Sequence, residues 1–217
     1  LGDVWVEWLY GGRATEYRRE LDMDTGIAEV SYRSDGARYR REYFVAAAPD
    51  NAFVMRMTCD GAGRMGARVR LDRTEREDAA RTHAKVPLPE STTVTKAEEN
   101  GLTLAGRFQE GFAFAAAARV TSDGRVTRER AALRIEGASE IVVVVAMATG
   151  DDAADPAVWC REHLAGLRMP FERLRQRQAE AHQRMFRRVH LTLGGAGDDG
   201  LAERMIEAAV SAKRGSA

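Results

Sequence analysis

The feature that most constrains this fold is a long series of short runs typical of β-strands, in most of which apolar and polar residues alternate. The runs fill the chain from Asp3 to about Gly150, and most end at turn residues such as Gly, Asp, Asn or Ser. They cover residues 4–9, 17–21, 27–33, 39–45, 52–58, 66–71, 92–96, 102–108, 112–121, 126–129, 132–135 and 140–147. Many short strands at this spacing predict one large antiparallel β-sandwich.

Turn residues also predict which neighbouring strands pair as hairpins. Asp24-Thr25-Gly26, Ser34-Asp35-Gly36 and Asn100-Gly101 each lie between two alternating runs, which is typical of tight hairpin turns. A further hairpin is predicted to join residues 52–58 to 66–71. Residues 73–89 are highly charged and run into Pro-Leu-Pro, so we expect a long loop there.

After Gly150 the spacing of apolar residues changes from two to about 3.6, which indicates helices. Asp155 followed by Pro156 is typical of a helix start. The first predicted helix has Val158, Trp159, His163, Leu164 and Leu167 on one side. The second starts at Pro170, and its expected apolar stripe is Phe171, Leu174, Met185 and Phe186.

The predicted organisation is a sandwich over residues 1–150 and a helical linker over 151–217. Within the linker we expect a short strand at 189–193, a flexible acidic joint at 194–200 and one more helix at 201–213. The fold class predicted from the residues is therefore mainly β, with a short helical extension.

Composition excludes several classes of function. The 217 residues carry a formal net charge of zero, so there is no electrostatic reason to expect nucleic acid or an anionic membrane as a partner. The longest apolar run, residues 141–148, is too short to span a bilayer and is rich in β-branched residues. It is predicted to be a buried central strand.

Metal, cofactor and catalytic motifs are not found in the sequence. The two cysteines, Cys59 and Cys160, lie in segments of different character, and a disulfide framework is not implied. No nucleophile elbow, phosphate-binding loop or zinc spacing appears, and the glycine-rich stretch from Gly194 lacks the lysine of a phosphate loop. We therefore predict no catalytic residue, no cofactor and no metal site. The four histidines never occur at metal-ligand spacing; they are His83, His163, His182 and His190.

Three carboxylates occupy alternate positions just before Gly26: Glu20, Asp22 and Asp24. On an extended strand they would share one face, where they could bind a cation or serve as an acid. The same carboxylates repel one another, and the stretch does not fit a calcium loop because its glycine comes one position early and the closing glutamate is missing. We favour a solvated hairpin.

Aromatic residues leave carbohydrate binding open. Trp5 lies on the opposite side of its strand from Val4, Val6 and Trp8, where it could offer a flat face to a sugar; Tyr10 is a second candidate. The alternative, which we favour, is that Trp5 is buried between this domain and another part of a protein. Trp159, Phe171 and Phe186 at helical spacing are interpreted as core or docking residues.

Several stretches in combination resemble the amino-terminal domain of glycoside hydrolase family 95, the α-L-fucosidases. The family shows an LGDL strand, a YRRELDLDTA hairpin and a REYFAS-type pair, and the likeness spans roughly residues 1–195. The matching positions are residues 1–4, 17–26, 41–46, Pro49, Asp50, Val54 and Arg56, followed by LRIEGASEIVVVVAMATG and QRMFRRVHLTLGG.

The resemblance implies a β-supersandwich that packs on a helical (α/α)₆ barrel. This barrel would be the catalytic domain of the full-length protein and the partner of the sandwich. The family's catalytic carboxylate and water-activating residues lie in that barrel, so none is assigned to this chain. The chain opens without a methionine or a leader, and we expect it to be an excerpt that lacks the first strands and the barrel. Its compartment is undetermined.

Three hypotheses follow. The first is a non-catalytic N-terminal sandwich of a hydrolase acting on fucosyl glycans, inactive alone. The second is a free-standing carbohydrate-binding sandwich. The third is a degenerate remnant, whose mark would be poor stability, since missing strands leave an unpaired edge and exposed apolar surface.

Overall fold

The computed structural model describes residues 2–9, 12–61, 65–73, 91–167 and 169–188. Residues 1–183 form one compact unit, and residues 184–217 form a second, of which only 184–188 are described. The predicted loop at 73–89, apart from Arg73, lies outside the described residues. So do the segments predicted at 189–193, 194–200 and 201–213, together with Tyr10, His83 and His190.

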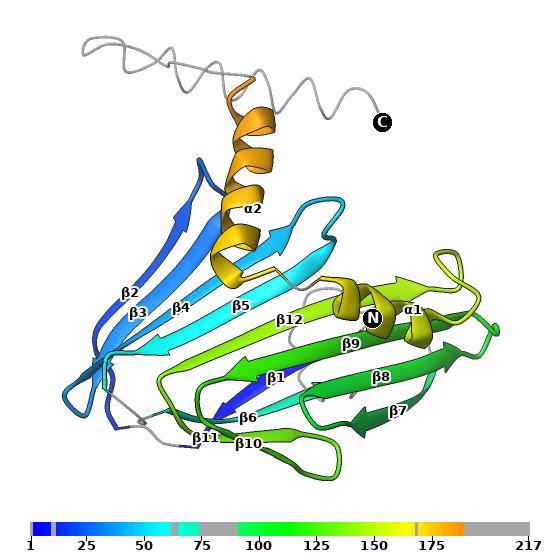
Figure 1. The fold of residues 1–217 in the computed structure, drawn as a ribbon, viewed down its shortest axis with the longest axis horizontal. Coiled ribbons are helices and arrows are strands. Elements are labelled where there is room, and N and C mark those ends of the chain that lie inside the picture. The colour runs from blue at the N-terminus through cyan, green and yellow to red at the C-terminus, as the bar shows by residue number, and fades with distance from the viewer. Residues whose placement is uncertain (1, 10–11, 62–64, 74–90, 168, 189–217) are drawn as a thin grey trace, which may run out of the picture. The chain divides into compact units, whose positions relative to one another are not determined.

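The fold consists of two antiparallel sheets and two helices (Figure 1), which confirms the predicted mainly β class. The smaller sheet has the order β1 (Asp3–Trp8), β6 (Met65–Asp72), β11 (Leu133–Ala138), β10 (Arg125–Arg128). The larger sheet has the order β2 (Thr15–Asp22), β3 (Ile27–Ser34), β4 (Ala37–Ala46), β5 (Ala52–Cys59), β12 (Glu140–Thr149), β9 (Ala113–Ser122), β8 (Gly101–Phe108), β7 (Ser91–Ala97).

Three of the four predicted hairpins are confirmed, and one is wrong. β2 pairs with β3, β3 with β4, and β7 with β8. β5 and β6 do not pair with each other: β5 lies between β4 and β12, whereas β6 lies between β1 and β11 in the other sheet. The chain after Cys59 therefore crosses from one sheet to the other, so that the apolar faces of β5 and β6 meet across the core.

The first core lies between the two sheets. The smaller sheet contributes alternate residues of β6 and β11 that are fully buried, and the larger sheet contributes the facing residues of β5, β8, β9 and β12. Its largest buried members include Met57, Met65, Leu102, Leu104, Phe114, Leu133, Ile135 and Ile141.

The second core lies on the opposite face of the larger sheet, under helices α1 (Pro156–Gly166) and α2 (Phe171–Phe186). α1 packs over β12, β9 and β8 (Figure 1). The floor beneath the helices is built largely from alanines, among them Ala115, Ala117, Ala146 and Ala148. No described helix is long and apolar enough to cross a membrane.

The apolar run at residues 141–148 is a central strand buried on both faces, as predicted. Ile141, Val143 and Val145 face the core between the sheets, while Val144 and Ala146 face the helices. A strand with two buried faces needs no polar alternation, which explains its continuous apolar sequence.

The predicted helix starts are confirmed, but the second apolar stripe is only partly right. Asp155 caps α1 by accepting a hydrogen bond from the backbone N–H of Val158 at 3.0 Å. In α2, Phe171 and Leu174 are buried, whereas Met185 and Phe186 are exposed. The third buried position of α2 is Gln178, whose Oε1 accepts from the N–H of Ala47 at 3.1 Å.

Candidate functional site

The acidic residues before Gly26 form a hairpin end rather than a shared site. Asp22 Oδ1 accepts from the N–H of Asp24 at 2.9 Å and so closes the β2–β3 turn. Glu20 pairs with Arg18, and Asp24 accepts from the side chain of Gln183 at 2.7 Å. Each carboxylate therefore has its own partner. In the described part of the chain, no group of three or more His, Cys, Asp and Glu side chains is placed to hold a metal ion.

The two described histidines that were tested as ligands make structural contacts. Nε2 of His163 lies 2.7 Å from the carbonyl oxygen of Asp50, and its ring stacks on Trp159 with centroids 4.7 Å apart. Nε2 of His182 lies 2.9 Å from the carbonyl oxygen of Met23. Both contacts join a helix to a turn of the larger sheet.

The cysteines are free and buried. Cys160 faces the floor of the second core, with its sulfur 3.7 Å from the carbonyl oxygen of Ala115. Burial raises the pKa of the Cys160 thiol to about 11, so the nucleophilic thiolate is disfavoured.

Trp5, which was one candidate for a sugar platform, is covered by Arg70. It lies on the outer face of the smaller sheet, where the guanidinium of Arg70 sits 5.1 Å from the centre of the indole ring. Arg70 also pairs with Asp72 at 3.0 Å and with Glu7 at 3.7 Å. This ring face therefore belongs to an ion-pair network and is not an open platform.

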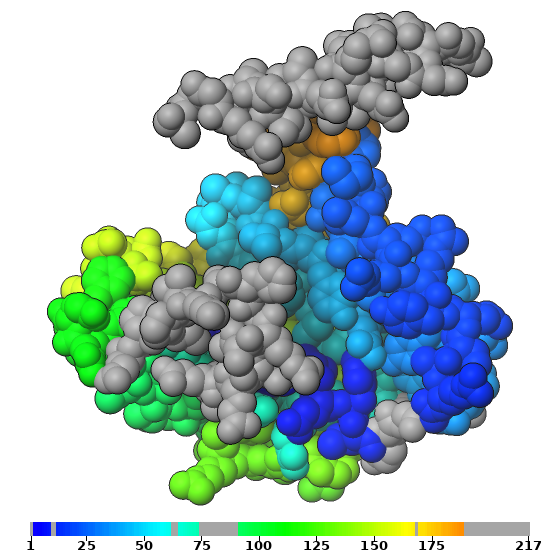
Figure 2. Space-filling model, turned by 180° about the vertical axis from the view of Figure 1, so that it is seen from behind, coloured from blue at the N-terminus to red at the C-terminus, as the bar shows by residue number. Residues whose placement is uncertain are grey.

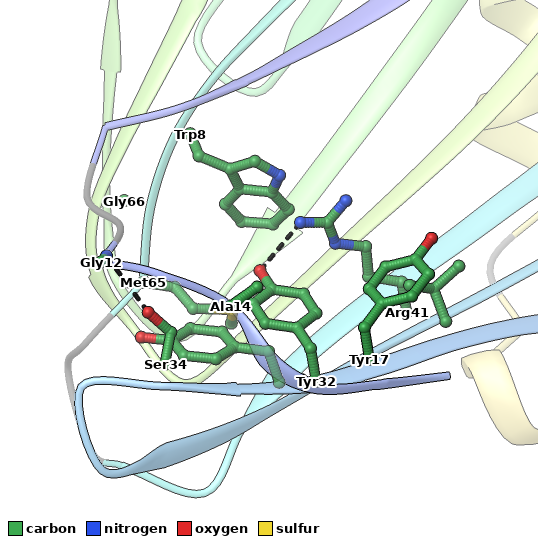
Figure 3. Close-up of a pocket in the computed structure, with 11 residues that line it drawn as sticks. Trp8, Gly12, Ala14, Tyr17, Tyr32, Ser34, Arg41, Met65 and Gly66 are labelled. Atoms are coloured by element: carbon green, nitrogen blue, oxygen red, sulfur yellow. Dashed lines mark hydrogen bonds between the residues drawn. The ribbon is translucent and has the colours of Figure 1, made fainter. Parts of the chain in front are cut away.

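A different aromatic site lies between β1 and the larger sheet (Figure 3). Trp8 stands on one side, Tyr17 and Tyr32 stand on the other, and the guanidinium of Arg41 lies between them. We call this the Trp8–Arg41 cavity; its volume is about 310 Å³. It is lined by Trp8, Gly12, Ala14, Tyr17, Val30, Tyr32, Ser34, Tyr39, Arg41, Met65 and Gly66.

The topology explains why this space is open. β1 is an end strand of the four-stranded sheet, while β2, β3 and β4 form one end of the eight-stranded sheet. The same side of the molecule presents β1 in dark blue and β2–β4 in lighter blue (Figure 2). The inner face of β3 and β4 beyond β1 is therefore left partly uncovered, and it carries Tyr32, Tyr39 and Arg41.

Arg41 is the central polar group of the cavity. Its guanidinium lies 4.3 Å from the ring centre of Trp8 and 5.2 Å from that of Tyr32, and its Nη2 donates to the Tyr32 hydroxyl at 2.8 Å. Its Nε is buried and has no hydrogen-bond partner among the described residues. None of the ion pairs between described residues includes Arg41. A second cavity, of about 240 Å³, shares Trp8 and Arg41 with the first.

The chemistry available in the Trp8–Arg41 cavity is binding rather than catalysis. The described residues that line it include aromatic rings, one guanidinium and the Ser34 hydroxyl, and none of them carries a carboxylate or an imidazole. General acid–base hydrolysis needs a group that exchanges protons near neutral pH, and the lining residues that the structure describes offer none.

Sequence reasoning missed this cavity because its walls come from strands distant in the chain. The available signal was local: Tyr39, Arg41 and Tyr43 occupy alternate positions of one strand, and Tyr32 lies opposite Tyr39 on the next. Only the crossing of β1 over that face brings Trp8 to them.

Comparisons with known proteins place the chain among glycoside hydrolase-like domains. The family model described as "Glycosyl hydrolase family 65, N-terminal domain" matches residues 1–154. "Alpha-L-fucosidase 2" of Arabidopsis thaliana is 26% identical over 221 residues, an alignment that covers 90% of this chain and 26% of that protein. The chain thus spans about a quarter of the length of this curated relative.

A solved structure gives the same picture of the fold. The "Putative kojibiose phosphorylase from human microbiome" matches with a TM-score of 0.57 and 10% identity, over 84% of this chain and 27% of that one. At this identity the match speaks for the fold alone. Together with the family model, it confirms that the chain has a glycoside hydrolase-like N-terminal domain.

Proposed function

Because the chain belongs to the family of glycosyl hydrolase family 65 N-terminal domains, we propose that it is the non-catalytic N-terminal β-sandwich of a glycoside hydrolase that acts on fucosyl glycans. The alignment with the fucosidase carries the proposal: it runs through nearly the whole chain yet takes in only about a quarter of that relative. The reacting groups would then belong to the remaining three quarters, which we propose to include an (α/α)₆ barrel.

In this proposal the domain has a supporting role. The helices that follow the sandwich are fixed to the larger sheet by buried apolar contacts and by polar ones, including the pair between Arg175 and the buried Glu42 at 3.0 Å. A rigid connection of this kind would hold a following domain in a defined position. The proposed partner is the protein's own barrel, with the glycan as an indirect one.

Hydrolysis assays test the proposal. The 217-residue chain is expected to give no turnover of an aryl α-L-fucoside above a buffer blank. A longer polypeptide from the same gene that includes the following region is expected to hydrolyse the α-L-fucoside and to leave an aryl α-D-glucoside intact. Turnover by the short chain would refute the non-catalytic role, and activity of the long form on the glucoside alone would refute the fucosyl assignment.

The remnant hypothesis is tested by the behaviour of the isolated chain. Two well-buried cores lead us to expect a folded protein with a cooperative urea transition and a single monomeric or oligomeric peak on gel filtration. Elution as a broad aggregate with no unfolding transition would favour the remnant.

A further inference from the structure

We propose that the Trp8–Arg41 cavity binds a saccharide unit that carries a single carboxylate, with Arg41 as the partner of that carboxylate. This goes beyond the supporting role, and the two proposals stand independently. The carrying observation is a guanidinium that lies between aromatic rings, donates to one neutral hydroxyl and forms no ion pair with a described residue.

The state of Arg41 calls for an acceptor from outside the described residues. Burying part of a guanidinium costs free energy unless hydrogen bonds and an opposite charge compensate. Within the described part of the chain, Arg41 makes one hydrogen bond, to a neutral hydroxyl. Arg70 provides the internal comparison: its Nε also lacks a hydrogen bond with a described residue and it also lies over a tryptophan, yet it pairs with two carboxylates. A carboxylate facing Arg41 would supply what Asp72 and Glu7 supply to Arg70.

The charge of the cavity favours a monoanion. Among the described residues that line the cavity, Arg41 is the only ionisable cation. One guanidinium matches one carboxylate in charge and in its forked geometry, whereas a phosphate dianion would keep an uncompensated charge among aromatic rings.

The walls favour a sugar ring as the carrier of that carboxylate. Tyr32 and Tyr39 stack with their ring centres 5.1 Å apart and an angle of 9° between their planes, and the Tyr17 ring beside them is 62% exposed. Apolar ring faces with a few polar groups are typical of small-ligand sites, and about 310 Å³ is at the small end of their range. The size suits one or two pyranose rings. Ser34, whose Oγ accepts from the N–H of Gly12 at 3.1 Å, adds a hydroxyl donor at the wall.

The decisive experiment compares two sugars that differ in charge at one carbon. The 217-residue chain is titrated with methyl β-D-glucuronide and, as the neutral counterpart, methyl β-D-glucoside, using calorimetry and tryptophan fluorescence. We expect the glucuronide to bind and the glucoside to bind roughly tenfold to a hundredfold more weakly, as for loss of a charge-assisted hydrogen-bond pair.

Variants locate the binding. Arg41→Gln is expected to reduce glucuronide affinity to that of the glucoside. Arg70→Gln, which removes the matching guanidinium from Trp5 on the outer face of the smaller sheet, is expected to leave affinity unchanged. Tyr17→Ala removes an exposed wall residue, so it tests the site even if Arg41→Gln fails to fold. This variant is expected to bind both sugars more weakly.

Three results would overturn the proposal. They are equal affinity for the two sugars, equal loss of affinity in Arg41→Gln and Arg70→Gln, and no binding of either sugar by a correctly folded chain. A structure of a longer form in which an extended polypeptide segment pairs with β1 and fills the cavity would also overturn it. These outcomes leave the hydrolysis assays unaffected, because those assays address the rest of the protein.

Discussion

At the scale of the residue, Asp123 is a carboxylate whose charge matters for the fold. Burial opposes its ionisation, but its Oδ1 accepts from the N–H groups of Glu140 and Ser139, each at 2.9 Å, and these bonds hold the pKa of Asp123 below its usual range. A depressed folded-state pKa means that the stabilisation is present above the unfolded pKa, about 3.9, and is lost as the pH falls through the folded value.

We expect Asp123→Asn to reduce the pH dependence of stability. Urea unfolding at pH 6 and at pH 3 should show a smaller loss of unfolding free energy in the variant than in the original chain, because asparagine can accept the same bonds without titrating. Identical losses in the two proteins would show that Asp123 does not contribute.

Cys160 should be inert in the folded chain. With a pKa of about 11, only roughly one thiol in a thousand is ionised at pH 8, and the side chain is buried. Cys59 is buried as well. The thiol reagent dithiobis(nitrobenzoic acid) should therefore label neither cysteine of the native protein within minutes, and should label both in urea. Rapid labelling of one native thiol would contradict the described packing.

At the scale of the element, β8 contains a glycine that its neighbour strand requires. A Cβ added to Gly106 would lie 2.4 Å from Cζ of Phe114, and Phe114 is itself buried in the first core. Gly106→Ala is expected to cost about 1–3 kcal/mol in unfolding free energy, because the buried ring must shift. Gly101→Ala in the same strand is the matched control: its Cβ would lie 3.4 Å from the carbonyl oxygen of Ala118, an ordinary contact, and we expect no loss.

Leu174 is the most deeply buried residue of α2. Leu174 is 1% exposed and belongs to the second core, so Leu174→Ala is expected to cost about 2–5 kcal/mol in urea unfolding. Arg173→Ala, one residue earlier on the exposed side of the helix, should change the unfolding free energy by less than about 0.5 kcal/mol. Equal effects would mean that α2 is not held by its buried face.

Local patterns predicted the elements well because strands and helix caps are encoded within a few residues. Asn100-Gly101 and Asp155-Pro156 each set their turn or helix start by chemistry contained in the motif. The choice of sheet for β6 is not local, since its alternation would suit either sheet, and the hairpin prediction failed there. The same limit hid the Trp8–Arg41 cavity, and it led to a stripe through Met185 where the helix instead buries Gln178.

At the scale of the whole molecule, the two cores share strands and should unfold together. β5, β9 and β12 present one face to the smaller sheet and the other to the helices. Variants that retain only Trp8, beside the first core, or only Trp159, beside the second, are expected to report the same urea midpoint by fluorescence. Separate midpoints would show that the helices detach from a sandwich that remains folded.

The alanines beneath α1 set how close a helix can come to a sheet. Ala115 and Ala117 on β9, with Ala146 and Ala148 on β12, are buried and contribute single methyl groups to the second core. In a close-packed core, small side chains of this kind allow a helix to approach the sheet closely. Enlarging any one of them would act as a wedge. A bulkier residue at any of these four positions is therefore expected to push α1 away from the sheet and to destabilise the second core.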